Sequence, residues 1–309
     1  MCIFSQPVES VSNTKIFARL EDTAWQHLVY QMDFASQRDN AIILPLPVQP
    51  GFGEADSLKF VSLKHYEGFF SDLQRGFPIA LPDSPSRGGA FSNQLDVPRL
   101  AVHEVGDFVA SFVPTQSDFE RLDEQFRIPQ SSWDLIPKYA DYGFAVFQLK
   151  TKAGKPHPMA FRFRSRLAAD RSVFFPTVHI HDGQVHEREG FDHVLYLQSA
   201  EFDATCGDYV KRGYHVTDRA TGYVRSVGPA KDFCRVEKTQ GMVAGDQLVH
   251  RLEKKGRFRN DDIIARLSRS RAAAAPEAFG VMGVTAIAGV MGLKWICDRR
   301  DLMAEAQDG

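Results

Sequence analysis

The sequence predicts an α+β protein that is mainly antiparallel β, with a few inserted helices. The apolar runs in roughly the first 200 residues are short, they alternate with polar residues, and turn residues separate them. Hydrophobic residues make up 43% and charged residues 25% of the 309 residues, which are ordinary values for a globular protein. The formal net charge of −2 gives no reason to expect nucleic acid or an anionic membrane as a partner.

Short runs rich in β-branched and aromatic residues predict the strands. They are expected at Thr14–Leu20, Trp25–Ala35, Asn40–Val48, Leu58–Leu63, Arg99–Val105, Asp107–Val113, Tyr142–Thr151, Pro158–Arg164, Ser172–His181 and Phe191–Gln198. Pro45 and Pro47 cannot donate to a ladder, so their strand is expected to end at a sheet edge. Alternation places Arg162, Arg164 and Arg166 on one strand face, where they either bind an anion or solvate an exposed surface.

Helical periodicity and end signals predict fewer helices. They are expected at His65–Arg75, Ser117–Phe126, Trp133–Tyr139 and Asp261–Arg271. The first ends before Gly76, and the second begins with a capping box of Ser117 and Glu120. The Pro82–Asn93 loop either divides the fold or covers a site.

The last part of the chain differs in composition. We expect a β-rich domain over residues 1–250 and a separate segment over 251–309, basic at first and then apolar. Ala278–Leu293 lacks charged residues but is shorter than the roughly 20 residues of a membrane span. It is expected to be a helical or partly ordered tail that packs on the body of the protein or on another subunit of a homo-oligomer, with membrane contact as the less favoured alternative.

Cysteine spacing and the first residues point to a reducing compartment. Cys2, Cys206, Cys234 and Cys297 form no C-x-x-C pair, and no charged and then apolar leader precedes them. The cytoplasm is therefore the expected location. No glycine-rich phosphate loop stands between a strand and a helix, so no nucleotide cofactor is expected.

The segment Val178–His186 carries the strongest local signal. Asp182-Gly183 between alternating apolar residues is typical of a two-residue hairpin turn. A hairpin with that turn would place His179 opposite His186, and alternation would put His181 on the same face. Three imidazoles would then converge.

Three converging imidazoles are suited to a divalent transition metal such as zinc, iron or manganese. His193 is the candidate fourth ligand, and an open position would allow a bound water to ionise near neutral pH. The alternative is that alternation alone produces the pattern and the histidines are solvated or hydrogen-bonded.

Cys2 is the second candidate site. If Met1 is removed, the thiol acquires a neighbouring α-amino group that can act as its general base. The alternative is that Cys2 is a small buried residue on the first strand.

The opening residues, MCIFSQPVESVSNTKIFARLED, resemble the choloylglycine-hydrolase and penicillin-acylase group of N-terminal nucleophile hydrolases. The resemblance implies that Arg19 lowers the thiol pKa and that Asp22 holds the α-amine. Cys2, TKIFAR and NAIILPLPVQP also resemble a bacterial protein family of unknown function, which implies no chemistry.

Three functions therefore remain open, and the sequence does not decide whether the chain is an enzyme. The first is a metalloprotein with a histidine site on a β-hairpin, acting as a hydrolase. The second is an N-terminal cysteine amidohydrolase acting on a small molecule or a peptide. The third is a non-enzymatic β-rich module attached to a partner or membrane through its tail.

Overall fold

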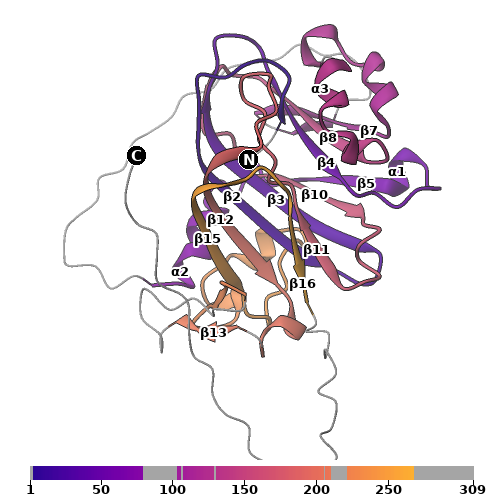
Figure 1. Ribbon diagram of the computed structural model, residues 1–309. Helices are drawn as coiled ribbons and strands as arrows, with labels where there is room; N and C mark the ends of the chain where they lie inside the picture. The colour runs from indigo at the N-terminus through magenta and orange to yellow at the C-terminus, as the bar shows by residue number, and fades with distance from the viewer. Residues whose placement is uncertain are drawn as a thin grey trace, which may run out of the picture. The chain divides into compact units, whose positions relative to one another are not determined.

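Two β-sheets face each other across an apolar core in this computed structural model (Figure 1). The structure describes residues 3–78, 103–105, 107–128, 130–204, 206–209 and 221–267, which belong to one compact unit. Most strand pairs are antiparallel, and β12 with β2 is a parallel exception. The predicted α+β class with mainly antiparallel β structure is confirmed.

The smaller sheet has five strands in the order β1-β4-β8-β7-β6. These strands are Ile3–Phe4, Ala41–Leu46, Gly143–Leu149, Phe108–Val113 and His103–Val105, in the order of the sheet. β1 pairs with β4 only at Ile42 and Ile43, so Pro45 lies where β8 is the one neighbouring strand among the described residues. Its missing N–H is tolerated there, as expected for a proline at a sheet edge.

The larger sheet has nine strands in the order β13-β14-β15-β12-β2-β3-β10-β5, and β9 pairs with β3. Their ranges are Gly207–Asp208, Val224–Arg225, His250–Arg259, Arg188–Gln198, Ser10–Leu20, Trp25–Ala35, Met159–Arg164, Leu58–Ser62 and, for β9, Ala153–Gly154. β11 (Ser172–Phe175) pairs with β16 (Ile263–Arg266) as a separate ribbon.

Alternation along the strands divides the apolar residues among three clusters. Ile16, Leu28 and Phe161 face the core between the sheets. Their neighbours Phe17 and Val29 face outward and are covered by α2 (Phe69–Arg75) and by residues from the 224–249 region.

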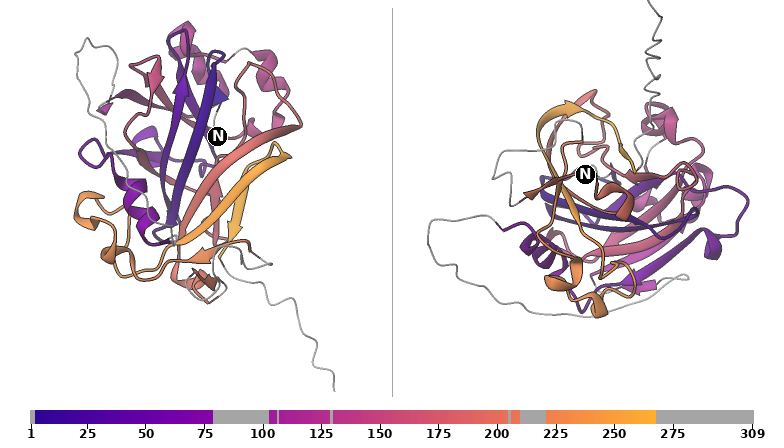
Figure 2. Two further views of the ribbon diagram at one scale, coloured as in Figure 1. Left: turned by 90° about the vertical axis from the view of Figure 1, so that its left-hand side faces the viewer. Right: turned by 90° about the horizontal axis from the view of Figure 1, so that it is seen from below.

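The outer face of the smaller sheet is covered by short helical turns, which Figure 2 shows from further directions. These are η1 (Gln116–Arg121), η2 (Glu124–Phe126), α3 (Gln130–Asp134) and η3 (Pro137–Tyr139). Further short turns among the described residues are α1 (Glu54–Ser57), η4 (Ala200–Phe202), η6 (Ala230–Asp232) and η7 (Val236–Lys238). No helix within the described ranges is long and apolar enough to cross a membrane.

Several local predictions are wrong. The described part of the expected helix Asp261–Arg271 contains the strand β16 instead, and β15 runs from His250 to Arg259, so strands continue past the predicted boundary at residue 250. The expected helix over Ser117–Phe126 is two 3-10 turns, and Thr115, not Ser117, bonds the Asp118 carboxylate. The predicted loop at Pro82–Asn93 and the tail at Ala278–Leu293 lie outside the described residues.

Candidate functional site

The histidine segment keeps the predicted alternation but forms no hairpin. Val178 and Ile180 are buried against the helical turns of the smaller sheet, and His179 faces the other way. Residues 176–187 contain no strand, and Asp182-Gly183 is a bend with a positive φ at Gly183. The segment lies beside the N-terminal strand, because Phe4 N–H donates to the Ile180 carbonyl. The predicted pairing of His179 with His186 is therefore wrong.

Asn260 takes the place of a partner strand for His179. Its Oδ1 accepts from the His179 N–H at 2.7 Å, and its Nδ2 donates to the His179 carbonyl at 2.9 Å. The same Nδ2 donates to the His186 carbonyl at 3.0 Å. One side chain thus satisfies backbone groups that a ladder would otherwise pair.

Three imidazoles do come together, but they are not the predicted three. His179 stacks on His181 with ring centroids 5.3 Å apart and on His193 with centroids 5.1 Å apart, at interplanar angles of 16° and 14°. His186 is exposed and lies 2.9 Å from the Asp182 carboxylate, which raises its pKa. Burial lowers the pKa of His181 to about 4 and holds the pKa values of His179 and His193 well below the usual range.

The stack does not have the geometry of the predicted metal site. A ring nitrogen offers its lone pair in the plane of the ring, so stacked, nearly parallel imidazoles do not direct their lone pairs at one point. Within the described part of the chain, no group of three or more His, Cys, Asp or Glu residues is arranged to hold a metal ion. Metal binding by His179, His181, His186 and His193 as a hairpin site is not supported by this arrangement.

The residues predicted to act with Cys2 have other partners. The Arg19 guanidinium donates to the carbonyls of Met242 and Gly241, and burial lowers its pKa. Asp22 closes the turn between β2 and β3, because its Oδ1 accepts from the N–H groups of Ala24 and Trp25. Cys2 lies outside the described residues, so its role as a nucleophile stays a prediction.

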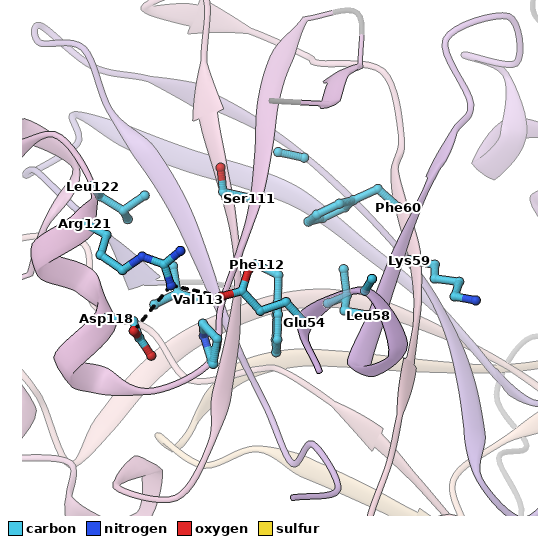
Figure 3. A pocket seen from close by; sticks show the side chains of 13 residues that line it. Glu54, Leu58, Lys59, Phe60, Ser111, Phe112, Val113, Asp118, Arg121 and Leu122 are labelled. Atoms are coloured by element: carbon cyan, nitrogen blue, oxygen red, sulfur yellow. Dashed lines mark hydrogen bonds and ion pairs between the residues drawn. The ribbon is translucent and has the colours of Figure 1, made fainter. Parts of the chain in front are cut away.

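A groove of about 660 Å³ lies where the two sheets approach each other. Figure 3 shows Asp118, Arg121 and Leu122 of the η1 region on one side, with Leu58 and Lys59 of β5 on the other. Residues Ser111, Phe112 and Val113 of β7 lie between them. The volume of the groove lies within the range of roughly 300–1,000 Å³ that is typical of ligand sites.

The groove runs along strand edges of both sheets. β5 is the terminal strand of the larger sheet. β6 pairs with β7 only as far as Ala110, so Ser111–Val113 has β8 as its one strand neighbour among the described residues. Strand edges present backbone N–H and C=O groups at intervals that match another extended chain.

The groove is apolar inside and charged at its mouth. Leu58, Phe60 and Phe112 pack against the core between the sheets. Arg121 bridges Glu54, 2.9 Å away on α1, and Asp118, 3.4 Å away on its own turn. These carboxylates raise the pKa of Arg121, and the ion pair links the two sides of the opening.

A scan against protein-family models finds no match. Among solved structures, the crystal structure of baculovirus P35 is similar, with a TM-score of 0.45 and 14% identity over 87% of this chain and 100% of that chain. The P35 structure from the caspase-8/P35 complex has a TM-score of 0.40 and 13% identity over 82% of this chain and 95% of that chain. Similarity at this level does not define a function for this chain.

Sequence patterns predicted the strands that form the groove but not the groove itself. Leu58–Leu63 and Asp107–Val113 were both expected as strands, and both are present. Strand order is a tertiary property, and nothing local in either run marks it as an edge. The exposed Lys59 between the apolar Leu58 and Phe60 is the one local signal, because charged residues are common on edge strands.

Proposed function

We propose that this chain is a binding module that holds an extended peptide segment of a partner protein in the groove along β5 and β7. The observation that carries the proposal is the position of an open, apolar groove beside strand edges of both sheets. An extended peptide can add to such an edge through main-chain hydrogen bonds, while pockets beside the edge receive alternate side chains.

The lining favours a peptide over a small polar ligand. Leu58, Phe60, Phe112 and Leu122 offer apolar surface, and three of the charged groups near the opening, Arg121, Glu54 and Asp118, are already paired with one another. Burial of apolar side chains would stabilise the complex by about 25 cal/mol per Å² before the cost of ordering the peptide is subtracted. The hydroxyl of Ser111 and the backbone of both edges supply the polar contacts.

The proposal is tested by selecting short peptides from a random display library on the immobilised full chain. Selected peptides should protect backbone amides of β5 or of Ser111–Val113 from hydrogen exchange. Phe112→Ser removes an apolar wall of the groove and should weaken peptide binding by about tenfold, equivalent to ~1.4 kcal/mol. Leu135→Ser is the matched control, because Leu135 is 62% exposed and does not line the groove.

The two substitutions are compared only after thermal unfolding shows that both variants are folded. Protection confined to regions other than β5 and β7 would contradict the proposal, and so would a library that yields no binder to the wild-type protein. Equal loss of binding in both variants would also contradict it.

A further inference from the structure

The two faces of β5 differ in chemistry, and this difference bears on which peptide the groove accepts. Leu58 and Phe60 point to the core side, since they lie opposite Phe163 and Phe161 of β10. Lys59 lies opposite Arg162, so both point to the outer face of the larger sheet. An added strand would continue the same alternation, with successive side chains on opposite faces.

Positive charge gathers on this outer face around one indole. Lys59 Nζ lies 5.6 Å from the ring centroid of Trp25, and the guanidinium carbons of Arg162 and Arg164 lie 5.0 and 4.9 Å from it. Arg164 also lies 4.3 Å from the ring of Phe52. These cation–π contacts fix the cations near one another at the end of the sheet that borders the groove.

The nearby carboxylates Glu21 and Asp22 offset only part of the charge of the three cations Lys59, Arg162 and Arg164. Glu21 bonds Arg162 at 2.9 Å and also lies 3.2 Å from His27. Asp22 accepts from backbone N–H groups of its turn and keeps its charge near Arg164, but it forms no ion pair with Arg164. Among the described residues, Lys59 and Arg164 take part in no ion pair, and Arg164 Nε donates to a backbone carbonyl at Asp56.

We infer that the groove selects an extended peptide in which acidic side chains alternate with apolar ones. This inference rests on the proposed function and names the class of peptide that the same site takes. Side chains opposite Leu58 and Phe60 would enter the apolar groove. A side chain opposite Lys59 would point to the outer face, with its Cβ about 5 Å from that of Lys59. A carboxylate there meets a surplus of positive charge.

The sequence left two alternatives for Arg162, Arg164 and Arg166, an anion site or a solvated face. Arg166 is excluded from the anion site, because it forms a double hydrogen bond with the Asp141 carboxylate. Arg162 and Arg164 lie with Lys59 on the outer face of the larger sheet, around Trp25. The acidic groups of the peptide would therefore meet Lys59 first, with Arg164 and Arg162 behind it.

The test uses two synthetic peptides that share the apolar positions of a library-selected binder and carry either Glu or Lys at the intervening positions. The Glu peptide should bind the wild-type chain more tightly by about fivefold or more, and the difference should shrink in high salt. Lys59→Glu should reverse the preference. Lys152→Glu is the matched control, since Lys152 is exposed and forms no ion pair among the described residues.

The outcomes separate this inference from the proposed function. Peptides that protect β5 but show no preference for Glu over Lys would overturn the inferred selection of acidic side chains and leave the proposed binding function intact. Failure of every peptide to protect β5 or β7 would overturn both. A single-stranded oligonucleotide that displaces the Glu peptide and binds more tightly in a Lys59-dependent way would show that the cluster serves a nucleic acid, which would also overturn the inference.

Discussion

At the scale of single residues, backbone groups of the segment around His179 are satisfied by side chains that lie far away in the sequence. Asn260 bonds both backbone groups of His179, 81 residues before it. Asp262 also bonds the neighbouring segment, because its Oδ1 accepts from the Thr177 N–H at 2.9 Å, and its Oδ2 accepts from the Tyr139 hydroxyl at 2.6 Å. The loop before β16 is thus tied to the histidine segment by side chains instead of a ladder.

Asn260→Ala should destabilise the protein by about 1–3 kcal/mol, because it leaves the buried N–H and C=O of His179 without partners. Asn260→Asp keeps the acceptor for the His179 N–H but places an acceptor oxygen against the carbonyls of His179 and His186, so it should not restore the stability. Urea unfolding of the three proteins at neutral pH measures the differences. An Asn260→Ala variant within about 0.5 kcal/mol of the wild type would show that this side chain is not a substitute for a strand.

These polar residues also explain why a helix was expected over Asp261–Arg271. Asn260 and Asp261 have the chemistry of N-caps, since their side-chain oxygens commonly accept from the first N–H groups of a helix. In the structure, Asn260 and Asp262 accept from another segment, and the chain continues as β16 beside β11. Helix propensity could not reveal this, because the side-chain oxygens of Asn260 and Asp262 accept hydrogen bonds from residues far away in the sequence.

At the scale of elements, the sequence predicted strands better than their pairing. Trp25–Ala35 has the same bounds in prediction and structure, and the ends of most other strands shift by a few residues. The hairpin at Asp182-Gly183 does not form, because Ile180 bridges Ile3 of the N-terminal strand and the carbonyls of Ile180 and His181 accept from Phe4 and Val8 instead. Alternation is local, so it was predictable, whereas the partner of a strand depends on the whole fold.

The candidate site was predictable only in part for the same reason. His179 and His181 were correctly placed on one face, but the third ring is His193 on β12, which no short-range turn connects to them. The groove depends on β5 being the terminal strand of the larger sheet, and the local sequence pattern does not determine the order of the strands.

At the C-terminal end of α2, we predict a destabilising effect of alanine where helix propensity alone would predict a stabilising one. Gly76 closes α2, and a Cβ added there would lie 2.6 Å from the ring of Phe233. Its φ of −65° is open to any residue, so alanine would be favoured by about 1 kcal/mol if only backbone freedom mattered. We expect Gly76→Ala to destabilise by about 1–3 kcal/mol instead, because the Phe233 ring is buried in the apolar cluster that covers α2 and has to move.

Phe233→Leu provides the control for Gly76→Ala, since the smaller side chain makes room for the added methyl group. The double variant should recover part of the loss, and the coupling between the two sites should exceed about 0.5 kcal/mol in a double-mutant cycle. A stabilised Gly76→Ala variant would mean that the ring moves without cost.

At the scale of the whole molecule, neutral histidines are distributed through the layers. His181 lies in the stack beside the N-terminal strand, and His27 lies on the outer face of the larger sheet against Met242. Burial lowers the pKa of each to about 4. His157, stacked on Phe108 at 4.4 Å, also has its pKa lowered by burial. The folded state therefore resists protonation at several places.

This resistance makes stability depend on pH in a defined direction. Above about pH 6.5, these histidines are neutral in both the folded and the unfolded chain, and they add no pH dependence. As the pH falls from about 6.5 towards 4, the unfolded chain binds protons that the folded chain does not. The free energy of unfolding then falls by about 1.4 kcal/mol per pH unit for each such histidine. His186 acts in the opposite direction, because its pKa is raised beside Asp182.

His181→Asn tests this account, because it removes one buried titrating ring and keeps a polar side chain of similar size. Urea unfolding at several pH values between 7.5 and 4.5 should show that stability falls less steeply with pH in this variant. Its unfolding should take up about one proton fewer than that of the wild type at the lower pH values. His186→Asn is the control, since its ring is exposed and its pKa is shifted upward. A His181→Asn slope equal to that of the wild type would show that His181 is protonated in the folded state, which would require the stacked rings to separate or to admit water well above pH 4.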